Sequence, residues 1–196
     1  MSVTTTDDDV AGFTIAETEG STGVDESGST DIFTIVLDTQ PSSDVVLSIT
    51  SSDTGEATVE SLIQFTSANW DTAQNVTVTG ADDGIIDGTQ TSTITVTVVD
   101  AITDDDFDAV ADQTVSVTTT DDDVAGFTIA ETEGSTGVDE SGSTDIFTVV
   151  LNAEPSSNVV LDITSSDTGE ATVTSSLTFT AANWDTAQNV TVTGVD

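Results

Sequence analysis

Hydrophobic and polar residues alternate in short runs along the whole chain. At residues 91–99, Ile94, Val96 and Val98 alternate with threonine, and the same two-residue period recurs at residues 31–38 and 74–80. A period of two places successive side chains on opposite faces of a strand, one facing a core and one facing water. These runs are rich in β-branched residues and are separated by turn residues, so they predict strands, and no helical period competes with them.

The pattern predicts seven strands before residue 121. They are expected at about residues 12–17, 31–38, 44–50, 56–65, 74–80, 91–99 and 113–120. Short strands at this spacing are typical of a sandwich of two sheets. We therefore predict an all-β fold made of tandem seven-stranded antiparallel β-sandwiches, immunoglobulin-like and connected as a Greek key.

The sequence repeats itself with an offset of 114 residues, so that Asp7 aligns with Asp121 and Trp70 with Trp184. Over the shared segment, only 12 of 76 positions differ. We predict that residues 1–9 are the last strand of a preceding repeat, that residues 10–123 are one complete repeat, and that residues 124–196 are a truncated second repeat. Two alternatives stay open for the second repeat: a fragment, or a unit that a neighbouring chain completes.

The charge of the chain is entirely of one sign. It has 37 acidic residues, no lysine, arginine or histidine, and a formal charge of -37. Such a chain repels itself, and it excludes nucleic acid and anionic membrane surfaces as partners unless a cation bridges them. It also has no cysteine, and no apolar run is long enough for a membrane helix. Because the strand pattern argues against disorder, we expect folding to depend on counter-ions.

Many of the acidic residues fall in loops that the predicted topology brings together. If the strands alternate in direction, the first, third and fifth connections and the end of the last strand lie at one pole of the sandwich. The acidic residues of these segments are Asp25, Glu26, Asp53, Glu56, Asp82, Asp83, Asp87, Asp121, Asp122 and Asp123. Crowded carboxylates raise one another's pKa and oppose folding, so a bound cation is expected to offset the repulsion.

Calcium fits this set of ligands best. It takes about 6–8 oxygen ligands from flexible loops, whereas zinc and copper sites usually need the His or Cys that this chain lacks, and magnesium tends to keep its waters. The alternative is a solvated acidic surface, such as the charge coat of a halophilic protein.

The stretch DDDVAGFTIAETEGSTGVDESG resembles the junction between tandem Calx-β domains, which are calcium-binding modules. The resemblance extends along each repeat through SSDTGEATV, LIQFTSANWDTAQNVTVTG and DDGIID. It implies calcium at the interdomain junctions. The implied ligands are Glu26, Asp53, Asp82, Asp83, Asp87, Asp121, Asp122 and Asp123, with Glu140, Asp167 and Asp196 in the second repeat. Only Asp87 stands where the family usually has a run of glutamates.

The two tryptophans and the acidic loop at residues 104–112 are less informative about function than the acidic segments predicted to lie at one pole. Trp70 and Trp184 are expected to close one end of each core, although an exposed tryptophan could stack on a sugar. The acidic loop at residues 104–112 could contact the preceding domain's calcium end or be a free surface loop. No enzyme is expected, because most nucleophile–base pairs need residues that the chain lacks.

The leading hypothesis is a calcium-stiffened structural repeat of a long extracellular protein on a bacterial cell surface, such as an adhesin or a fibre. Its partners would be neighbouring repeats of the same chain and possibly other copies in a fibre, with no nucleic acid and no membrane insertion. The alternatives are a sandwich that binds a carbohydrate or a protein, and a strand-exchanged subunit of an extracellular filament.

Overall fold

The structure is a computed structural model that describes residues 1–4, 6 and 8–196. It contains two compact units. The first unit comprises Met1–Asp83 and Gly88–Asp121, and the second comprises Gly84–Asp87 and Asp122–Asp196. Each unit is described by itself below.

The strand predicted at residues 1–9 includes Thr5 and Asp7, which lie outside the described residues. The described residues before Phe13 carry no assigned strand. Within the described part of the chain, no helix is long and apolar enough to cross a membrane.

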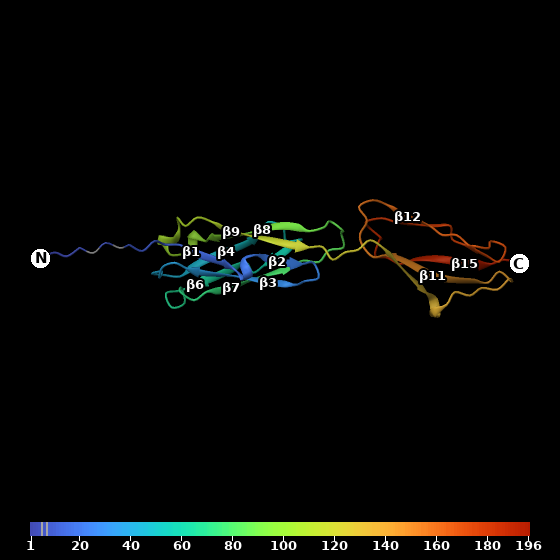
Figure 1. The fold of residues 1–196 in the computed structure, drawn as a ribbon, viewed down its shortest axis with the longest axis horizontal. Coiled ribbons are helices and arrows are strands. Elements are labelled where there is room, and N and C mark those ends of the chain that lie inside the picture. The colour runs from blue at the N-terminus through green and yellow to red at the C-terminus, as the bar shows by residue number, and fades with distance from the viewer. Residues whose placement is uncertain (5, 7) are drawn as a thin grey trace. The chain divides into compact units, whose positions relative to one another are not determined.

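The described part of the first unit consists of two sheets. Its strands are β1 (Phe13–Glu17), β2 (Thr22–Asp25), β3 (Thr30–Leu37), β4 (Val45–Ser51), β5 (Ala57–Val59), β6 (Leu62–Phe65), β7 (Gln74–Gly80), β8 (Gln90–Val98) and β9 (Gln113–Thr120). One sheet has the order β1-β3-β7-β5, and the other has the order β2-β9-β8-β4-β6. Figure 1 shows β3 and β7 together in one layer of this unit and β8 and β9 together in the other. The all-β sandwich predicted from the sequence is confirmed.

The core lies between these two layers and follows the predicted alternation. In β8, Ile94, Val96 and Val98 are buried while the residues between them are at least partly exposed. Phe33 and Ile35 of β3 are also fully buried, on the facing sheet. Burying one such side chain stabilises the fold by about 1.5–3 kcal/mol, so these alternating positions hold the layers together.

The strand predicted at residues 12–17 is β1, and the loop predicted after it contains a further short strand, β2, in the opposite sheet. β1 pairs with β3, antiparallel, whereas β2 pairs with β9 in the opposite sheet, and that pairing is parallel. Between β1 and β2, a short 3₁₀ turn places Glu19 at φ 56° and Gly20 at φ 84°. Positive φ values turn the chain sharply and are tolerated best by glycine. This turn redirects the chain from one sheet to the other.

The strand predicted at residues 56–65 is divided between the two sheets. β5 pairs with β7, and β6 pairs with β4 on the other side of the core. The break falls at Glu60 and Ser61, where no strand is assigned. The unpredicted strand β2 and this division account for the difference between the seven predicted strands and the strands of the first unit.

The second unit contains fewer strands in its described residues. They are β10 (Phe127–Glu131), β11 (Thr144–Leu151), β12 (Val159–Asp162), β13 (Ala171–Val173), β14 (Ser176–Phe179) and β15 (Gln188–Gly194). β10, β11, β15 and β13 form one sheet in that order, which matches β1-β3-β7-β5, and β12 pairs with β14. The described residues of this unit contain no strands that correspond to β8 and β9.

Equivalent residues of the two units therefore differ in exposure. Phe13 is 2% exposed, whereas Phe127, in an identical stretch of sequence, is 51% exposed. Residues 136–139 repeat the sequence of β2 but form no strand. The second unit keeps a smaller core around Val149, Phe179 and Val190.

Candidate metal centre

Four segments of the first unit meet at one pole, as the sequence predicted. The backbone N–H of Glu26, just after β2, donates a hydrogen bond to the carbonyl of Thr120 at the end of β9 (3.1 Å). The N–H of Ala81, just after β7, donates to the carbonyl of Glu56 (2.9 Å). A Cβ on Gly80 would collide with the backbone oxygen of Asp25, so β7 and β2 approach closely here. We call this end of the first unit the acidic pole.

The turn after β2 orients its two acidic residues differently. The side chain of Asp25 accepts a hydrogen bond from the Ser27 hydroxyl, and the Asp25 N–H donates to the Ser29 hydroxyl (2.7 Å). The hydrogen bonds from Ser27 and Ser29 lower the pKa of Asp25. Gly28, at φ 87°, closes the turn. Asp25 therefore fixes the turn, and the next residue, Glu26, is buried in the acidic pole.

Glu26 and Glu56 are buried carboxylic acids in a chain without cationic side chains. Glu26 is 1% exposed and Glu56 is 8% exposed. Transfer of an ionised carboxylate from water into a protein interior is costly unless a positive charge compensates it. Because the sequence has no Lys, Arg or His, no side chain of the chain can supply that charge, whereas a bound cation can.

Two groups of carboxylates at these residues have the spacing of metal ligands. Within the first unit, one oxygen from each residue lies within 4.8 Å of the other; the groups are Glu26 with Asp83, and Glu26 with Glu56. The predicted ligands Asp87 and Asp123 belong to the second unit, and their role as ligands stays a prediction. Calcium binds oxygen ligands at 2.3–2.6 Å, so two ligands of one ion are at most about 5 Å apart. The geometry of both groups therefore fits a calcium ion, and Glu26 belongs to both.

The other predicted ligands of the first repeat lie outside these groups in the described structure. Asp53 Oδ1 accepts a hydrogen bond from the Gly55 N–H (2.9 Å) within its own turn. Asp121 Oδ2 accepts one from the Gly88 N–H (2.8 Å). Asp82 and Asp122 are exposed. Their role as ligands stays a prediction.

The three predicted ligands of the second unit are all exposed. Glu140 and Asp196 belong to no described group of metal-binding spacing, and Asp167 Oδ1 accepts a hydrogen bond from the Gly169 N–H (2.9 Å), as Asp53 does from Gly55. In this unit Asp139 repeats the part of Asp25, with its pKa lowered by hydrogen bonds from Ser141 and Ser143. The role of Glu140, Asp167 and Asp196 as ligands also stays a prediction.

Glu56 is the residue that the predicted ligand set left out. The sequence places it at the acidic pole, but the resemblance to Calx-β domains favoured Asp53 in the same loop. The useful signal is that Glu56 directly precedes β5, whose first residue, Ala57, is fully buried. An acid at such a position is held next to the core, whereas Asp53 turns toward its own loop.

The acidic loop at residues 104–112 is anchored to the first unit. Asp104 is buried, and its carboxylate accepts hydrogen bonds from the Ser42 N–H (2.7 Å), the Ser42 hydroxyl (2.7 Å) and the Ser43 N–H (2.8 Å). These bonds, led by the one from the Ser42 hydroxyl, lower the pKa of Asp104 to about 2. Phe107 of the same loop is buried in the core. This part of the loop is thus a fixed structural element.

Trp70 and Trp184 pack against the cores of their units. Both are partly buried, and the carbonyl of each accepts a hydrogen bond from a core strand, Trp70 from the Leu37 N–H and Trp184 from the Leu151 N–H (both 3.1 Å). These contacts agree with the prediction that the tryptophans close the ends of the cores.

Comparisons with known proteins add little about function. No family model and no curated protein matches the chain. Similar solved structures include CBD12 from CALX1.2 (15% identity, TM-score 0.39, covering 93% of this chain and 75% of that one) and the calcium binding domain CBD12 of CALX1.1 (14%, 0.35, 93% and 76%). The E. coli chaperone DraB is another (7%, 0.42, 96% and 88%). With TM-scores below 0.5, these likenesses carry no argument about function.

Proposed function

We propose that this chain is part of a calcium-stiffened structural array, in which calcium binds the acidic pole and makes each repeat rigid. The array would belong to a long extracellular protein of a bacterial surface, an adhesin or a fibre. The near-identity of the two repeats supports the tandem array. Extracellular modules bind calcium with dissociation constants of about 10⁻⁴–10⁻³ M, so such an array would gain its ions outside the cell.

The burial of Glu26 carries this proposal. A surface coat of acidic residues would leave each carboxylate in water, where salt screens it. Glu26 instead has 1% of its surface exposed and lies within ligand distance of Glu56 and Asp83. Calcium would convert the repulsion between these groups into coordination bonds that join the ends of β2 and β7 to the start of β5.

Equilibrium dialysis against radioactive calcium tests the proposal directly. The full chain is expected to bind calcium with saturation, and Glu26→Gln combined with Glu56→Gln should remove at least one bound ion per chain. Asp8→Asn combined with Asp9→Asn, two exposed residues near the N-terminus, is the matched control and should retain all bound ions. Equal calcium binding by both double variants would contradict the proposal.

A second candidate function, strand exchange between copies, is favoured by the second unit. β12 pairs with β14, and no described strand of that unit occupies the other edge of β12, which corresponds to the edge of β4 that pairs with β8. Phe127 and Ile129 are 51% and 55% exposed beside this edge. Open strand edges and exposed apolar patches are sites where another chain can add a strand.

A peptide with the sequence of residues 88–121 tests strand exchange. Added to the full chain, it should slow amide hydrogen exchange in β12 by at least about tenfold, because it supplies the partner strand that β12 lacks. A peptide with Ile94→Thr and Val96→Thr keeps the length but loses the inward side chains and should have little effect. Unchanged exchange in β12 with the first peptide would rule this candidate out.

A further inference from the structure

The segment Gly84–Asp87 belongs to the second unit and packs on one end of it. The N–H of Glu154 donates a hydrogen bond to the Gly84 carbonyl (2.6 Å), and Ile85 forms a parallel β-bridge with Glu154. A Cβ on Gly84 would lie 2.7 Å from the ring of Trp184, so only glycine fits at this position. A Gly-Ile-Ile segment is thus seated on this end of the second unit.

Ile86 is the apolar anchor of this contact. Together with Ala125, Ala153, Glu154 and Pro155 it lines one apolar hollow of the second unit. The surface under Ile86 therefore consists of the chain just before β10 and the connection between β11 and β12. A backbone hydrogen bond at Glu154 fixes the segment above this surface.

The first unit has an equivalent surface, with threonine and glutamine in place of the alanine and glutamate of the β11–β12 connection. With the offset of 114 residues, Ala125 corresponds to Ala11, Ala153 to Thr39, Glu154 to Gln40 and Pro155 to Pro41. These four residues of the first unit line a cavity of about 490 Å³. We call it the Pro41 cavity.

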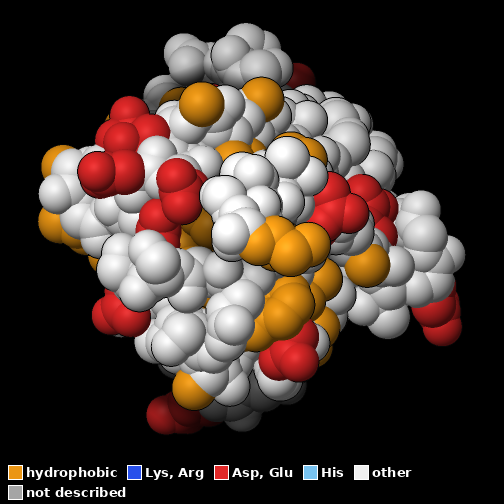
Figure 2. Space-filling model, turned by 90° about the vertical axis from the view of Figure 1, so that its left-hand side faces the viewer, with side chains coloured by type: hydrophobic (Ala, Val, Ile, Leu, Met, Phe, Trp, Pro, Cys, Tyr) orange, Lys and Arg blue, Asp and Glu red, His pale blue; other side chains and the backbone are white. Residues whose placement is uncertain are grey.

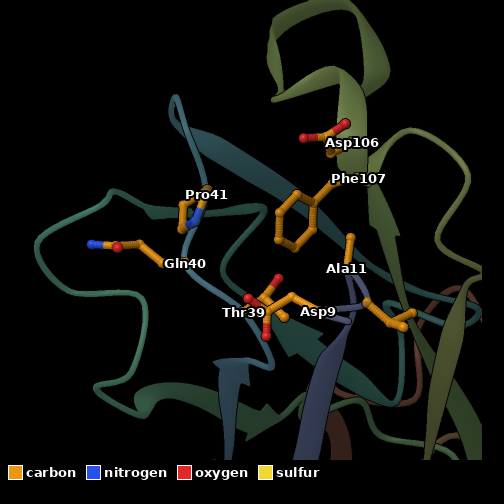
Figure 3. A pocket seen from close by; sticks show the side chains of 8 residues that line it. Asp9, Ala11, Thr39, Gln40, Pro41, Asp106 and Phe107 are labelled. Carbon is orange, nitrogen blue, oxygen red and sulfur yellow. The ribbon is translucent and has the colours of Figure 1, made fainter. Parts of the chain in front are cut away.

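Phe107 and Val10 complete the Pro41 cavity. Figure 3 shows the Phe107 ring between Pro41 and Ala11, with the Gln40 side chain directed away from the cavity. The side-chain amide nitrogen of Gln40 donates a hydrogen bond to the Ser67 carbonyl (2.8 Å). This bond holds the Gln40 side chain away from the cavity. The Gln40 backbone N–H makes no hydrogen bond to another described residue, whereas the equivalent N–H of Glu154 is bonded to Gly84.

Hydrophobic side chains gather in a patch at the end of the molecule shown in Figure 2, and acidic side chains border it. The Pro41 cavity itself has Asp9 and Asp106 at its rim. The Gly-Ile-Ile segment is likewise flanked by acids, Asp83 and Asp87. The repulsion between these two sets of acids weakens as salt or calcium screens it.

We propose that the Pro41 cavity is a docking site for the Gly-Ile-Ile loop of another repeat, supplied by a second copy of this sequence. In a tandem array the donor is the preceding repeat. The isoleucine side chains pack against Pro41 and Ala11, and the donor's glycine carbonyl accepts a hydrogen bond from the Gln40 N–H. This inference extends the proposed array, but it rests on apolar contacts and a backbone hydrogen bond, independently of calcium.

A disulfide cross-link in a lengthened chain tests the docking. Residues 10–123 are added once more in front of Val10, so that the whole 196-residue chain is kept, the natural junction is reproduced and a free loop precedes the Pro41 cavity. The added copy carries Ile86→Cys, and the original first unit carries Pro41→Cys. Since the natural chain has no cysteine, no other disulfide can form within it. Tethering raises the effective concentration of the loop to the millimolar range.

Two matched pairs calibrate the cross-link. Ile86→Cys with Pro155→Cys in the 196-residue chain, without the added repeat, reports the contact that the structure shows and should form a disulfide readily. Ile86→Cys in the added copy with Leu62→Cys, an exposed residue of β6, reports random collisions. We expect the Pro41 pair to react at least about tenfold faster than the Leu62 pair and at a rate near that of the Pro155 pair.

Reaction of the Pro41 pair no faster than the Leu62 pair would overturn the docking proposal. Each measurement is made with calcium and with a chelator. If the chain binds no calcium but the Pro41 pair reacts fast, the docking stands and the calcium proposal fails. If calcium binds and the Pro41 pair reacts slowly, the calcium proposal stands and the docking proposal fails.

Discussion

Glu26 and Glu140 occupy the same position in identical stretches of sequence, yet Glu26 is 1% exposed and Glu140 is exposed. The difference arises from β9, whose last residue, Thr120, accepts a hydrogen bond from the Glu26 N–H. The described part of the second unit has no counterpart of β9. The burial of a single carboxylate is thus decided by a strand that is remote from it in sequence.

The substitution Glu26→Gln should have opposite effects with and without calcium. In a chelator, it removes a buried negative charge and should raise the melting temperature by several degrees, since about 1 kcal/mol corresponds to 4–8 °C in a domain of this size. With calcium, it removes a ligand shared by both carboxylate groups and should reduce the stabilisation by calcium. Thermal unfolding followed by circular dichroism measures both effects.

Glu140→Gln is the internal control, because the residue has the same neighbours in sequence but is exposed. It should leave the melting temperature within about 1 °C of the unmodified chain in both conditions, as exposed substitutions usually cost little. Equal effects of the two substitutions would show that burial at the acidic pole has no energetic consequence.

Asp104 gives the first unit a stability that depends on acid pH. Its pKa of about 2 in the folded chain lies below the ordinary value of 3.8, so its contribution is complete above pH 4 and is lost as the pH falls toward 2. At pH 6, Asp104→Asn should lower the free energy of unfolding by about 2 kcal/mol, because hydrogen bonds to a charged acceptor are lost. The difference should shrink between pH 4 and pH 2.

Urea unfolding of the two proteins across this pH range measures the difference directly. The exposed neighbour Asp106, changed to Asn, serves as the control and should be close to neutral. A difference between Asp104→Asn and the unmodified chain that stays constant down to pH 2 would show that the Asp104 carboxylate is not the anchor of this loop.

At the scale of elements, a strand in this chain depends on its partner. Residues 22–25 form β2 against β9, whereas the identical residues 136–139 form no strand. In the same way, β4 spans Val45–Ser51, but β12 covers only Val159–Asp162. β4 pairs with β8, and the described part of the second unit contains no such partner for β12. Local sequence alone sets the alternation of side chains but not the length of the strand.

Amide hydrogen exchange measures this dependence without any substitution. The amides of Glu26 and Glu140 have identical neighbours in sequence and so the same intrinsic exchange rate. The Glu26 amide is hydrogen-bonded to Thr120 and buried, and it should exchange at least about a hundredfold more slowly than the Glu140 amide. Similar rates at the two positions would mean that β9 does not hold the turn after β2.

The sequence predicts the strands with clear alternation well. β3, β7, β8 and β9 lie within one residue of their predicted bounds, because apolar residues recur at every second position along one face of each strand. β2 was missed because residues 22–25 were assigned to the loop after the first strand, and their pairing with β9 is set by the tertiary fold. The division between β5 and β6 was missed because it shows only in how the strands pair: β5 pairs with β7, whereas β6 pairs with β4 in the other sheet.

The candidate metal centre was predicted to the level of loops. Topology alone identified the segments that meet at the acidic pole, because connections at one end of a sandwich are necessarily neighbours. The choice between Asp53 and Glu56 within one loop depends on which side chain faces inward. That orientation follows from the start of β5 at Ala57, which the sequence pattern did not locate.

On the scale of the whole molecule, the net charge of -37 opposes folding because the acidic residues repel one another. Diffuse salt reduces repulsion between exposed carboxylates, and any cation can supply that effect. The proposed centre at the buried carboxylates instead requires a bound ion, and calcium suits an all-oxygen set of flexible ligands better than magnesium does. The two explanations for the acidic residues therefore differ in whether the identity of the cation matters.

The melting temperature of the full chain at constant ionic strength tests this difference most directly. Three samples contain 1 mM calcium, 1 mM magnesium or a chelator, with sodium chloride adjusted to equalise the ionic strength. A ligand at about a hundred times its dissociation constant stabilises a protein by about 2.7 kcal/mol, so we predict a rise of several degrees with calcium and a clearly smaller one with magnesium. Equal melting temperatures in the three samples would contradict a calcium centre at the acidic pole.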